Sequence, residues 1–287
     1  MTKDEMYKNY YDSVSGDKKK YATVIKRFLK HVKVMPDKQA VERRIEEMRK
    51  AGYADGTIEW EYRAIRAFFN CNQIPWPFRR GEGPKIRERE VLALGIDDKV
   101  IERMVQVSKA GKISPIDSFY LALSTTYGMR RSELAQLIAE DFDLKARLLY
   151  VETKKHGRER YHLIPDAILP TIESGLKHLK PTSRDQLTKT FYRIERASNM
   201  QHTSDLGWHG FRRMLDRRLV QAGIDELAVR NFMRWKRSSN NMVARYYTLT
   251  TVTLDDTETS GVAQDSGDRD IDERVFAVHP FLRFWEA

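Results

Sequence analysis

The sequence contains a single cysteine, Cys71, so no disulfide can form within the chain. No cluster of cysteine, histidine or acidic residues has the spacing of a metal site, and we expect neither a metal nor another cofactor. The apolar runs are far shorter than the roughly 20 residues that a membrane span requires, and the N-terminal stretch MTKDEMYKNYY is polar. These absences predict an intracellular, cytoplasmic protein with no membrane partner.

Acidic residues are fewer than basic residues in this sequence. The chain has 51 Lys and Arg residues against 41 Asp and Glu residues, so its formal net charge is +10. This balance favours a polyanionic partner such as nucleic acid, with an anionic membrane surface as the weaker alternative. The 287 residues, of which 41% are hydrophobic, are enough for a substantial core and suggest roughly two domains.

The first part of the chain has the periodicity of amphipathic helices. In KKKYATVIKRFLKHV, apolar residues recur at the i, i+3, i+4 spacing of one helical face, with basic residues between them. VERRIEEMRKAG and DGTIEWEYRAIRAFFN predict two more such helices. The proline- and glycine-rich QIPWPFRRGEGPKIRERE then reads as a linker. We therefore expect a helical domain over residues 1–80 and a linker over residues 81–92.

The rest of the chain predicts a mainly α domain with a small β-hairpin or sheet over residues 93–254. Helical segments include DSFYLALSTTYG, GFRRMLDRRLVQAG and IDELAVRNFMRW. The stretch LLYVETKKHGRERYHLIP has the alternation of a strand, then a turn at KHG and a returning strand, so it predicts a hairpin with a basic tip. Residues 255–287 form an acidic tail, expected to be flexible over residues 255–273, with an aromatic tip.

Basic residues that could bind an anion begin in this second domain at YGMRRSELAQL. Arg130 stands there at a helix start, three residues before Glu133, so the two side chains share a face. The tip of the predicted hairpin carries Lys154 and Lys155. Each motif by itself is equally typical of a solvated surface.

Further along, WHGFRR places His209 and Arg212 three residues apart at a helix start, again on one face. MRWK contains Trp235, and the pair Tyr246 and Tyr247 follows in MVARYY. A tyrosine hydroxyl, with a pKa of about 10, is a poor nucleophile unless its anion is stabilised, and arginines can supply that stabilisation.

Taken in this order, the motifs resemble those of the tyrosine recombinase, or integrase, family, which includes phage integrases and Xer-type resolvases. The resemblance implies a two-domain clamp around DNA, with a helical core-binding domain followed by a catalytic domain. The family's catalytic residues correspond here to Arg130, Lys155, His209, Arg212, Trp235 and Tyr246. The segment WKRSSNNMVARY is about two residues longer than usual, so Tyr247 stays open as the alternative nucleophile, although the pattern Met-Val-x-Arg-Tyr selects Tyr246.

The implied function is that of a site-specific DNA recombinase that cuts and rejoins double-stranded DNA through a 3′-phosphotyrosyl intermediate and assembles as a tetramer on DNA. DNA integration by a viral or other mobile element would fit. Alternatives are DNA relaxation by a type IB topoisomerase, a catalytically silent DNA-binding regulator with this fold, and an RNA-binding helical protein. Intact catalytic residues argue against the silent regulator, and the sequence has no clear set of surface aromatics for stacking RNA bases.

The aromatic tip VFAVHPFLRFWEA carries too many large apolar side chains to remain in water. In the resembled family the corresponding segment often docks on a neighbouring protomer. Folding back onto its own domain is the alternative.

Overall fold

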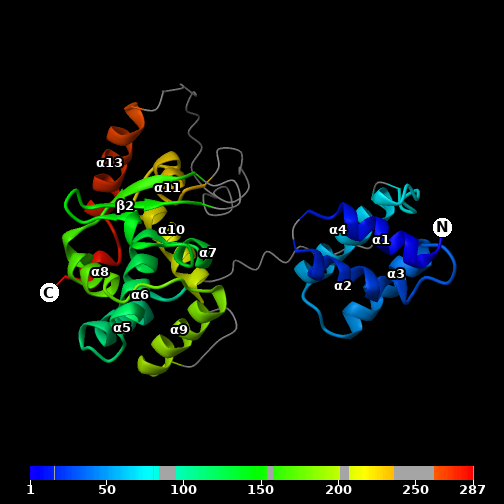
Figure 1. The fold of residues 1–287 in the computed structure, drawn as a ribbon, viewed down its shortest axis with the longest axis horizontal. Helices are drawn as coiled ribbons and strands as arrows, with labels where there is room; N and C mark the ends of the chain where they lie inside the picture. Colours follow the sequence, from blue (N-terminus) through cyan, green and yellow to red (C-terminus); the bar gives the residue numbers. More distant parts are fainter. Residues whose placement is uncertain are drawn as a thin grey trace. The chain divides into compact units, whose positions relative to one another are not determined.

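The computed structural model describes residues 1–15, 17–79, 81–83, 95–153, 158–200, 207–235 and 262–286. The chain divides into two compact units, Met1–Leu92 and Ala93–Ala287. Figure 1 shows the ribbon of both units, and each is described by itself below. Helices dominate the described residues, beside a small three-stranded sheet, which confirms the predicted fold class.

The first unit is a helical bundle around one apolar core. Its helices are α1 (Lys3–Ser13), α2 (Lys18–Leu29), α3 (Lys38–Lys50) and α4 (Asp55–Cys71). Three of them follow the predicted apolar periodicity, and Phe28, Ile45 and Phe69 from their inner faces are buried together. The sequence analysis missed α1, although Thr2 and Glu5 form a capping box at its start.

The second unit contains the remaining described helices and the sheet. Its longer helices are α5 (Asp98–Lys109), α6 (Pro115–Tyr127), α8 (Leu169–Leu176), α9 (Arg184–Ala197), α10 (Trp208–Gln221), α11 (Glu226–Phe232) and α13 (Val262–Ala277), and its short ones are α7 (Arg131–Leu134), η1 (Ala139–Asp141), η2 (Asp166–Ile168) and η3 (Leu282–Phe284). The sheet consists of β1 (Phe142–Asp143), β2 (Leu148–Val151) and β3 (Arg160–Leu163) in the antiparallel order β1-β2-β3.

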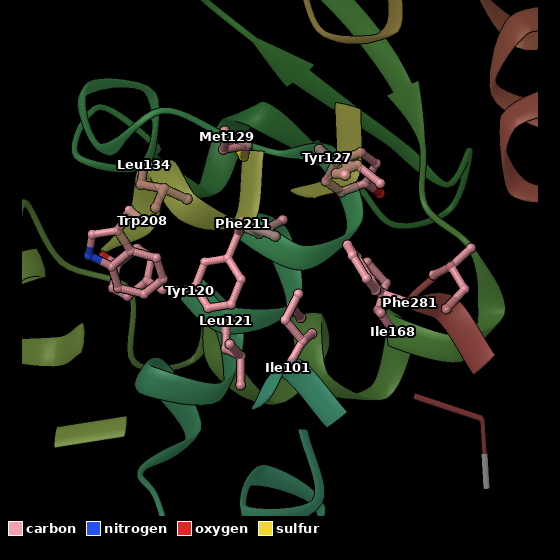
Figure 2. Packing of buried hydrophobic residues seen from close by; sticks show 14 of the residues in the cluster. Ile101, Tyr120, Leu121, Tyr127, Met129, Leu134, Ile168, Trp208, Phe211 and Phe281 are labelled. Atoms are coloured by element: carbon pink, nitrogen blue, oxygen red, sulfur yellow. The ribbon is translucent and has the colours of Figure 1, made fainter. Parts of the chain in front are cut away.

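Helix α6 is the centre of this unit, because every residue from Asp117 to Tyr127 is buried. Side chains from other elements close around it, among them Ile101 of α5, Phe211 of α10 and Phe281 near the C-terminus (Figure 2). Surrounded on all sides, α6 provides a fixed base for the turn that follows its last residue.

The two strands of the hairpin bury different kinds of side chain. On β2, Leu149 and Val151 face the apolar core. On β3 the buried residues are Arg160 and His162, which lie opposite Val151 and Leu149 in the register, whereas Tyr161 is half exposed. A charged residue and a histidine therefore occupy inward positions and require polar partners.

Those partners come from the C-terminal segment, where the prediction of a flexible chain over residues 255–273 is wrong for its described part. Helix α13 covers Val262–Ala277 and packs against β3 and α11. Its Asp272 is fully buried and accepts hydrogen bonds from Arg160 and from the Leu163 N–H. The acidic composition that suggested a solvated chain is compensated here by buried basic groups of the same unit.

The aromatic tip folds back onto its own unit. Phe281, Leu282 and Trp285 belong to the core, and the Trp285 Nε1 donates to Thr125 Oγ1 of α6 at 3.1 Å. His279 Nε2 lies 2.9 Å from the Thr126 carbonyl oxygen. The arrangement of this single chain is thus the second of the two alternatives for the tip.

Phe281→Ala should destabilise the second unit by about 3 to 5 kcal/mol, because it removes a fully buried ring and leaves a cavity. The nearby Val278, whose exposed fraction is 42%, offers a control, since Val278→Ala removes little buried surface. Denaturant unfolding of the full chain, followed by fluorescence of the tryptophans, measures both changes. Equal losses in the two variants would contradict the packing of the tip.

Candidate active site

The site begins where α6 ends. Gly128 terminates this helix with a left-handed φ of +57°, a conformation that glycine adopts without strain. An added Cβ would also lie 2.9 Å from the terminal methyl carbon of Met233 and 3.3 Å from the Arg212 Cα, so these neighbours would have to shift. The chain therefore reverses tightly, and Arg130 follows as the residue that caps α7.

Glu133 of α7 fixes Arg130 in two ways. Its Oε1 accepts from Arg130 Nη1 at 2.6 Å and its Oε2 accepts from the Arg130 backbone N–H at 2.7 Å. The carboxylate is buried, whereas the Arg130 side chain keeps an exposed fraction of 27%. The guanidinium of Arg130 is therefore held on its buried side by Glu133 and is open toward solvent on its other side.

Three arginines surround Glu133. Burial by itself would raise the pKa of this carboxyl group, but the charges of Arg234, Arg212 and Arg130 outweigh burial and lower the pKa to about 2. Glu133 is therefore ionised throughout the physiological pH range. One carboxylate cannot neutralise three guanidinium groups, so the cluster keeps a positive charge.

Arg212 is the buried member of this cluster on the α10 side, and its exposed fraction is 2%. Its Nη1 donates to the Gly128 carbonyl oxygen at 2.8 Å, and its Nη2 donates to the carbonyl oxygen of Met233. It thus joins the ends of α6 and α11. Burial, and then the neighbouring Arg130 charge, lower the pKa of Arg212, while Glu133 opposes that shift.

His209 and Arg130 line the same surface pocket, together with Arg131, Arg184 and Tyr192. Desolvation at the pocket wall, followed by the charges of Arg212, Arg213 and Arg130, lowers the pKa of His209 to about 4. The imidazole is consequently neutral at pH 7 in the DNA-free chain. The structure thus brings Arg130, His209 and Arg212 close to one another.

Trp235 closes the other side of Arg212. The Arg212 guanidinium lies 5.4 Å from the centre of the indole ring, within the range of a cation–π contact. Trp235 is buried, and within the described residues its Nε1 has no hydrogen-bond partner. Lys155, Tyr246 and the alternative Tyr247 lie outside the described residues.

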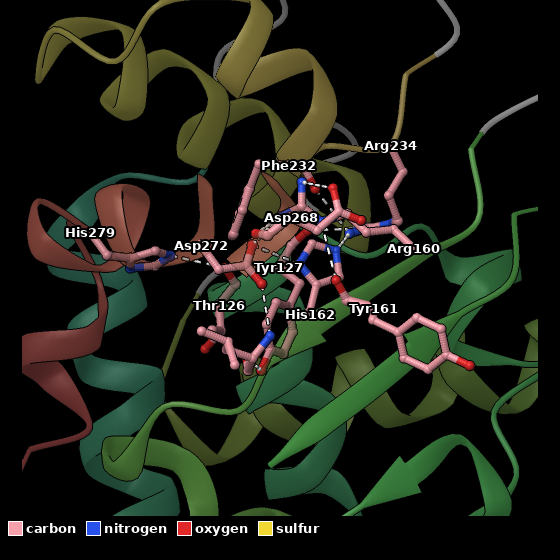
Figure 3. Close-up of polar contacts among 11 residues, drawn as sticks. Thr126, Tyr127, Arg160, Tyr161, His162, Phe232, Arg234, Asp268, Asp272 and His279 are labelled. Carbon is pink, nitrogen blue, oxygen red and sulfur yellow. Dashed lines mark hydrogen bonds and ion pairs between the residues drawn. The ribbon is translucent and has the colours of Figure 1, made fainter. Parts of the chain in front are cut away.

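Sequence reasoning missed Arg234, which directly precedes Trp235. This arginine is fully buried, and its Nη2 donates to Glu133 Oε2 at 3.0 Å and to the Tyr127 carbonyl oxygen at 3.2 Å. Its Nη1 lies 2.7 Å from His162 Nε2 (Figure 3). The helical pattern at the end of α11 gave no signal for it, because Arg234 follows the helix in a left-handed turn with φ of +56°.

The fold and the site together present a positively charged cluster at a pocket open to solvent, which is suited to binding an anion. The model of the Phage integrase family matches residues 95–252, more than half of the chain. The chain therefore belongs to this family, the tyrosine recombinases, and the resemblance that the sequence motifs suggested is confirmed.

Relatives and solved structures agree with this membership. The chain is 24% identical over 190 residues to tyrosine recombinase XerA of Pyrococcus furiosus, a match that covers 62% of this chain and 65% of the relative, just under two thirds. It is 23% identical over 239 residues to tyrosine recombinase XerA of Saccharolobus solfataricus, covering 77% and 79% respectively.

Two solved structures share the fold. One is the Tn1549 transposon integrase in complex with circular intermediate DNA, with a TM-score of 0.68, 17% identity and coverage of 88% of this chain and 96% of that one. The other is a lambda integrase dimer bound to a COC′ core site, with a TM-score of 0.62, 17% identity and coverage of 91% and 100%.

Among the residues that the structure describes, no helix is both long enough and apolar enough to span a membrane. Within the same residues, His, Cys, Asp and Glu side chains form no group of three or more that could ligate a metal ion.

Titration of His209 provides a direct test of the site's electrostatics. In the DNA-free protein its pKa should lie near 4, below the ordinary value of 6.5, because burial and then the charges of the surrounding arginines disfavour the protonated ring. As the pH falls, the imidazole of the unfolded chain is protonated near pH 6.5, whereas that of the folded chain is protonated only near pH 4. Protonation therefore favours the unfolded chain, and the free energy of unfolding decreases as the pH falls from 6.5 toward 4. NMR of the imidazole, assigned with His209→Gln, measures the pKa. A value at or above 6.5 would contradict the described charge cluster.

Proposed function

We propose that this protein is a site-specific DNA recombinase that breaks and rejoins strands of duplex DNA through a 3′-phosphotyrosyl intermediate. The observation that carries the proposal is the gathering of Arg130, Arg212 and His209 around Glu133, at a pocket that is open to solvent and keeps positive charge. This arrangement suits a phosphodiester, whose non-bridging oxygens accept charge-assisted hydrogen bonds.

In the proposed reaction the oxygen of Tyr246 attacks the phosphorus atom. A bond forms between them while the bond from phosphorus to the 5′ oxygen of DNA breaks, and Lys155 gives a proton to the departing oxygen. The 3′ strand end is then held as a phosphotyrosine ester. A free 5′ hydroxyl reverses the step, so rejoining requires no nucleotide cofactor.

The arginines would stabilise the extra negative charge on the phosphorane as the bond to Tyr246 forms. Arg130 offers its open edge to the pocket. Among the described residues, buried Arg212 uses two of its five N–H groups, for the carbonyls of Gly128 and Met233, and the remaining groups would meet the phosphate. His209, neutral before DNA binds, is able to accept the tyrosine proton or to hydrogen-bond a phosphate oxygen.

We further propose that residues 1–80 form the core-binding domain and residues 93–254 the catalytic domain of a DNA clamp. The support in the first unit is the exposed basic surface of α2 and of the residue that caps its C-terminus, which includes Lys19, Lys26 and Lys30. Contacts of such residues with phosphates position a protein on DNA without reading its sequence. The same proposal includes assembly into a tetramer on DNA and a DNA-associated location in the cytoplasm.

The covalent intermediate tests the function. Incubation with a nicked suicide substrate that carries the protein's recombination site should yield a protein–DNA adduct that survives a denaturing gel. Tyr246→Phe should abolish the adduct and leave DNA affinity nearly unchanged, because it removes one hydroxyl and no charge. An adduct that persists in Tyr246→Phe and vanishes in Tyr247→Phe would move the nucleophile by one residue. No adduct in the parent chain would reject the proposed chemistry.

Loss of a phosphate-binding arginine should slow the chemical step strongly. Arg212→Ala is expected to reduce the rate of adduct formation at saturating DNA by about 100- to 1000-fold, the usual effect of removing one transition-state donor. Arg218→Ala is the matched control, because Arg218 lies on the same helix and pairs with Asp98 at the surface. A rate in Arg212→Ala within tenfold of the parent would exclude it as a phosphate ligand.

A further inference from the structure

A continuous line of buried polar groups runs from α13 to the catalytic arginine, and Figure 3 shows its part from Asp272 through His162 to Arg234. Asp272 Oδ1 lies 3.3 Å from His162 Nδ1, and His162 Nε2 lies 2.7 Å from Arg234 Nη1. Arg234 Nη2 donates to Glu133 Oε2 at 3.0 Å, and Glu133 Oε1 accepts from Arg130 Nη1 at 2.6 Å. Only Arg130, at the end of this line, reaches solvent.

The direction of every bond in this line follows from the chemistry of its members. A guanidinium only donates, so His162 Nε2 accepts from Arg234 and carries no proton. The proton of the imidazole must then be on Nδ1, where it faces the Asp272 carboxylate. Burial, with the charges of Arg160 and Arg234, lowers the pKa of His162 well below 6.5, so the ring stays neutral. Burial raises the pKa of Asp272 to about 7, although the charge of Arg160 opposes that shift. Above that pH the line therefore alternates in sign from Asp272 to Arg130, with a neutral histidine of fixed tautomer within it.

Arg234 connects the two halves of this line, because it contacts both His162 and Glu133. Its backbone has a φ of +56°, a conformation that costs a residue other than glycine free energy and persists where the surroundings enforce it. Its guanidinium also donates to the carbonyl oxygens of Tyr127 and Phe232, at the ends of α6 and α11. The orientation that delivers Nη2 to Glu133 is thus set by several bonds at once.

We propose that Arg234 is a positioning residue for Arg130, acting through Glu133, and that Asp272 of α13 holds Arg234 in place through His162. By this route the seating of the C-terminal helix determines how firmly the phosphate-binding guanidinium is held. The inference rests on the proposed function, because its kinetic test uses DNA cleavage, although its geometry is testable without DNA.

The kinetic test compares the rate of adduct formation at saturating DNA with the affinity for DNA. Arg234→Met keeps most of the side-chain volume and removes the bonds to Glu133 and His162. It should lower the rate by about 100-fold, the effect of misplacing a catalytic group by about 1 Å, and change the affinity less than threefold. Arg234→Lys keeps the charge and one bond to Glu133, and should recover about tenfold of the lost rate.

A double-mutant cycle separates positioning from a general loss of stability. If Arg234 acts through Glu133, then Arg234→Met should slow a Glu133→Gln variant less than about twofold further, because the pathway is already broken. Multiplicative effects of the two substitutions would overturn the proposal. Should Arg234→Met fail to fold, Arg234→Lys and Asp272→Asn decide in its place: parental rates in both would overturn it.

Asp272→Asn tests the α13 end of the line without changing side-chain shape, and it should slow cleavage about tenfold. Its matched control is Arg274→Met on the same helix, which removes a surface pair with Asp225 and should leave the rate unchanged. Equal slowing in both would show that loosening α13 in any way suffices, and would overturn the specific role of Asp272.

The DNA-free readout is the tautomer of His162, observed through the ¹⁵N shifts of its ring. The proposal requires a neutral ring with the proton on Nδ1 in the parent chain and in Arg274→Met, and a redistributed proton in Asp272→Asn and Arg234→Met. An Nε2-protonated or charged ring in the parent would overturn it. Because this measurement needs no DNA, a parent chain with the expected tautomer and no adduct would reject the recombinase function while preserving the described geometry.

Discussion

A single buried carboxylate, Glu133, is the constraint on which the site depends. It accepts from the Arg130 side chain and backbone and from Arg234, and it lies within the field of Arg212. Without this anion three guanidinium groups would repel one another in a poorly hydrated environment, at a cost of several kcal/mol for each unpaired buried charge. With it, the cluster holds together and still has net positive charge to offer a phosphate.

The helix ends explain why the arginines stay where they are. Arg212 and Arg234 each donate to one carbonyl at the end of α6 and one at the end of α11. Such carbonyls have no partner within their helix and carry partial negative charge, so a cation there is favourable. Each of these arginines therefore links the ends of the two helices and also places its charge beside Glu133. The tight turn at Gly128 brings Arg130 to the same carboxylate.

Sequence reasoning predicted the part of the site that is written in short motifs. Arg130, Glu133, His209 and Arg212 lie at helix starts, where a fixed spacing determines which side chains share a face. Arg234 was missed because its position depends on a left-handed turn after α11, and no periodicity encodes that turn. Its burial could not be read from its residue type, since arginine is rarely buried unless paired.

The same reasoning failed for the C-terminal segment because composition was judged locally. Residues 255–273 are acidic, and an acidic stretch with few large apolar residues reads as a solvated chain. The basic groups that allow the segment to be buried are far away in sequence, since Asp272 of α13 is paired with Arg160 of β3. By contrast, the fold class, the hairpin and most helices of both units followed from periodicity, which needs no knowledge of distant partners. The exceptions are α1, α5 and α13, which the sequence analysis did not predict.

Trp235 adds a buried hydrogen-bond donor beside Arg212. Within the described residues its indole N–H is buried and has no acceptor, although buried donors in folded proteins are nearly always paired. A buried donor left without any partner would cost about 1 to 3 kcal/mol. Under the proposed function, a phosphate oxygen of DNA is one acceptor that would suit both this N–H and N–H groups of Arg212, as in a preorganised anion site.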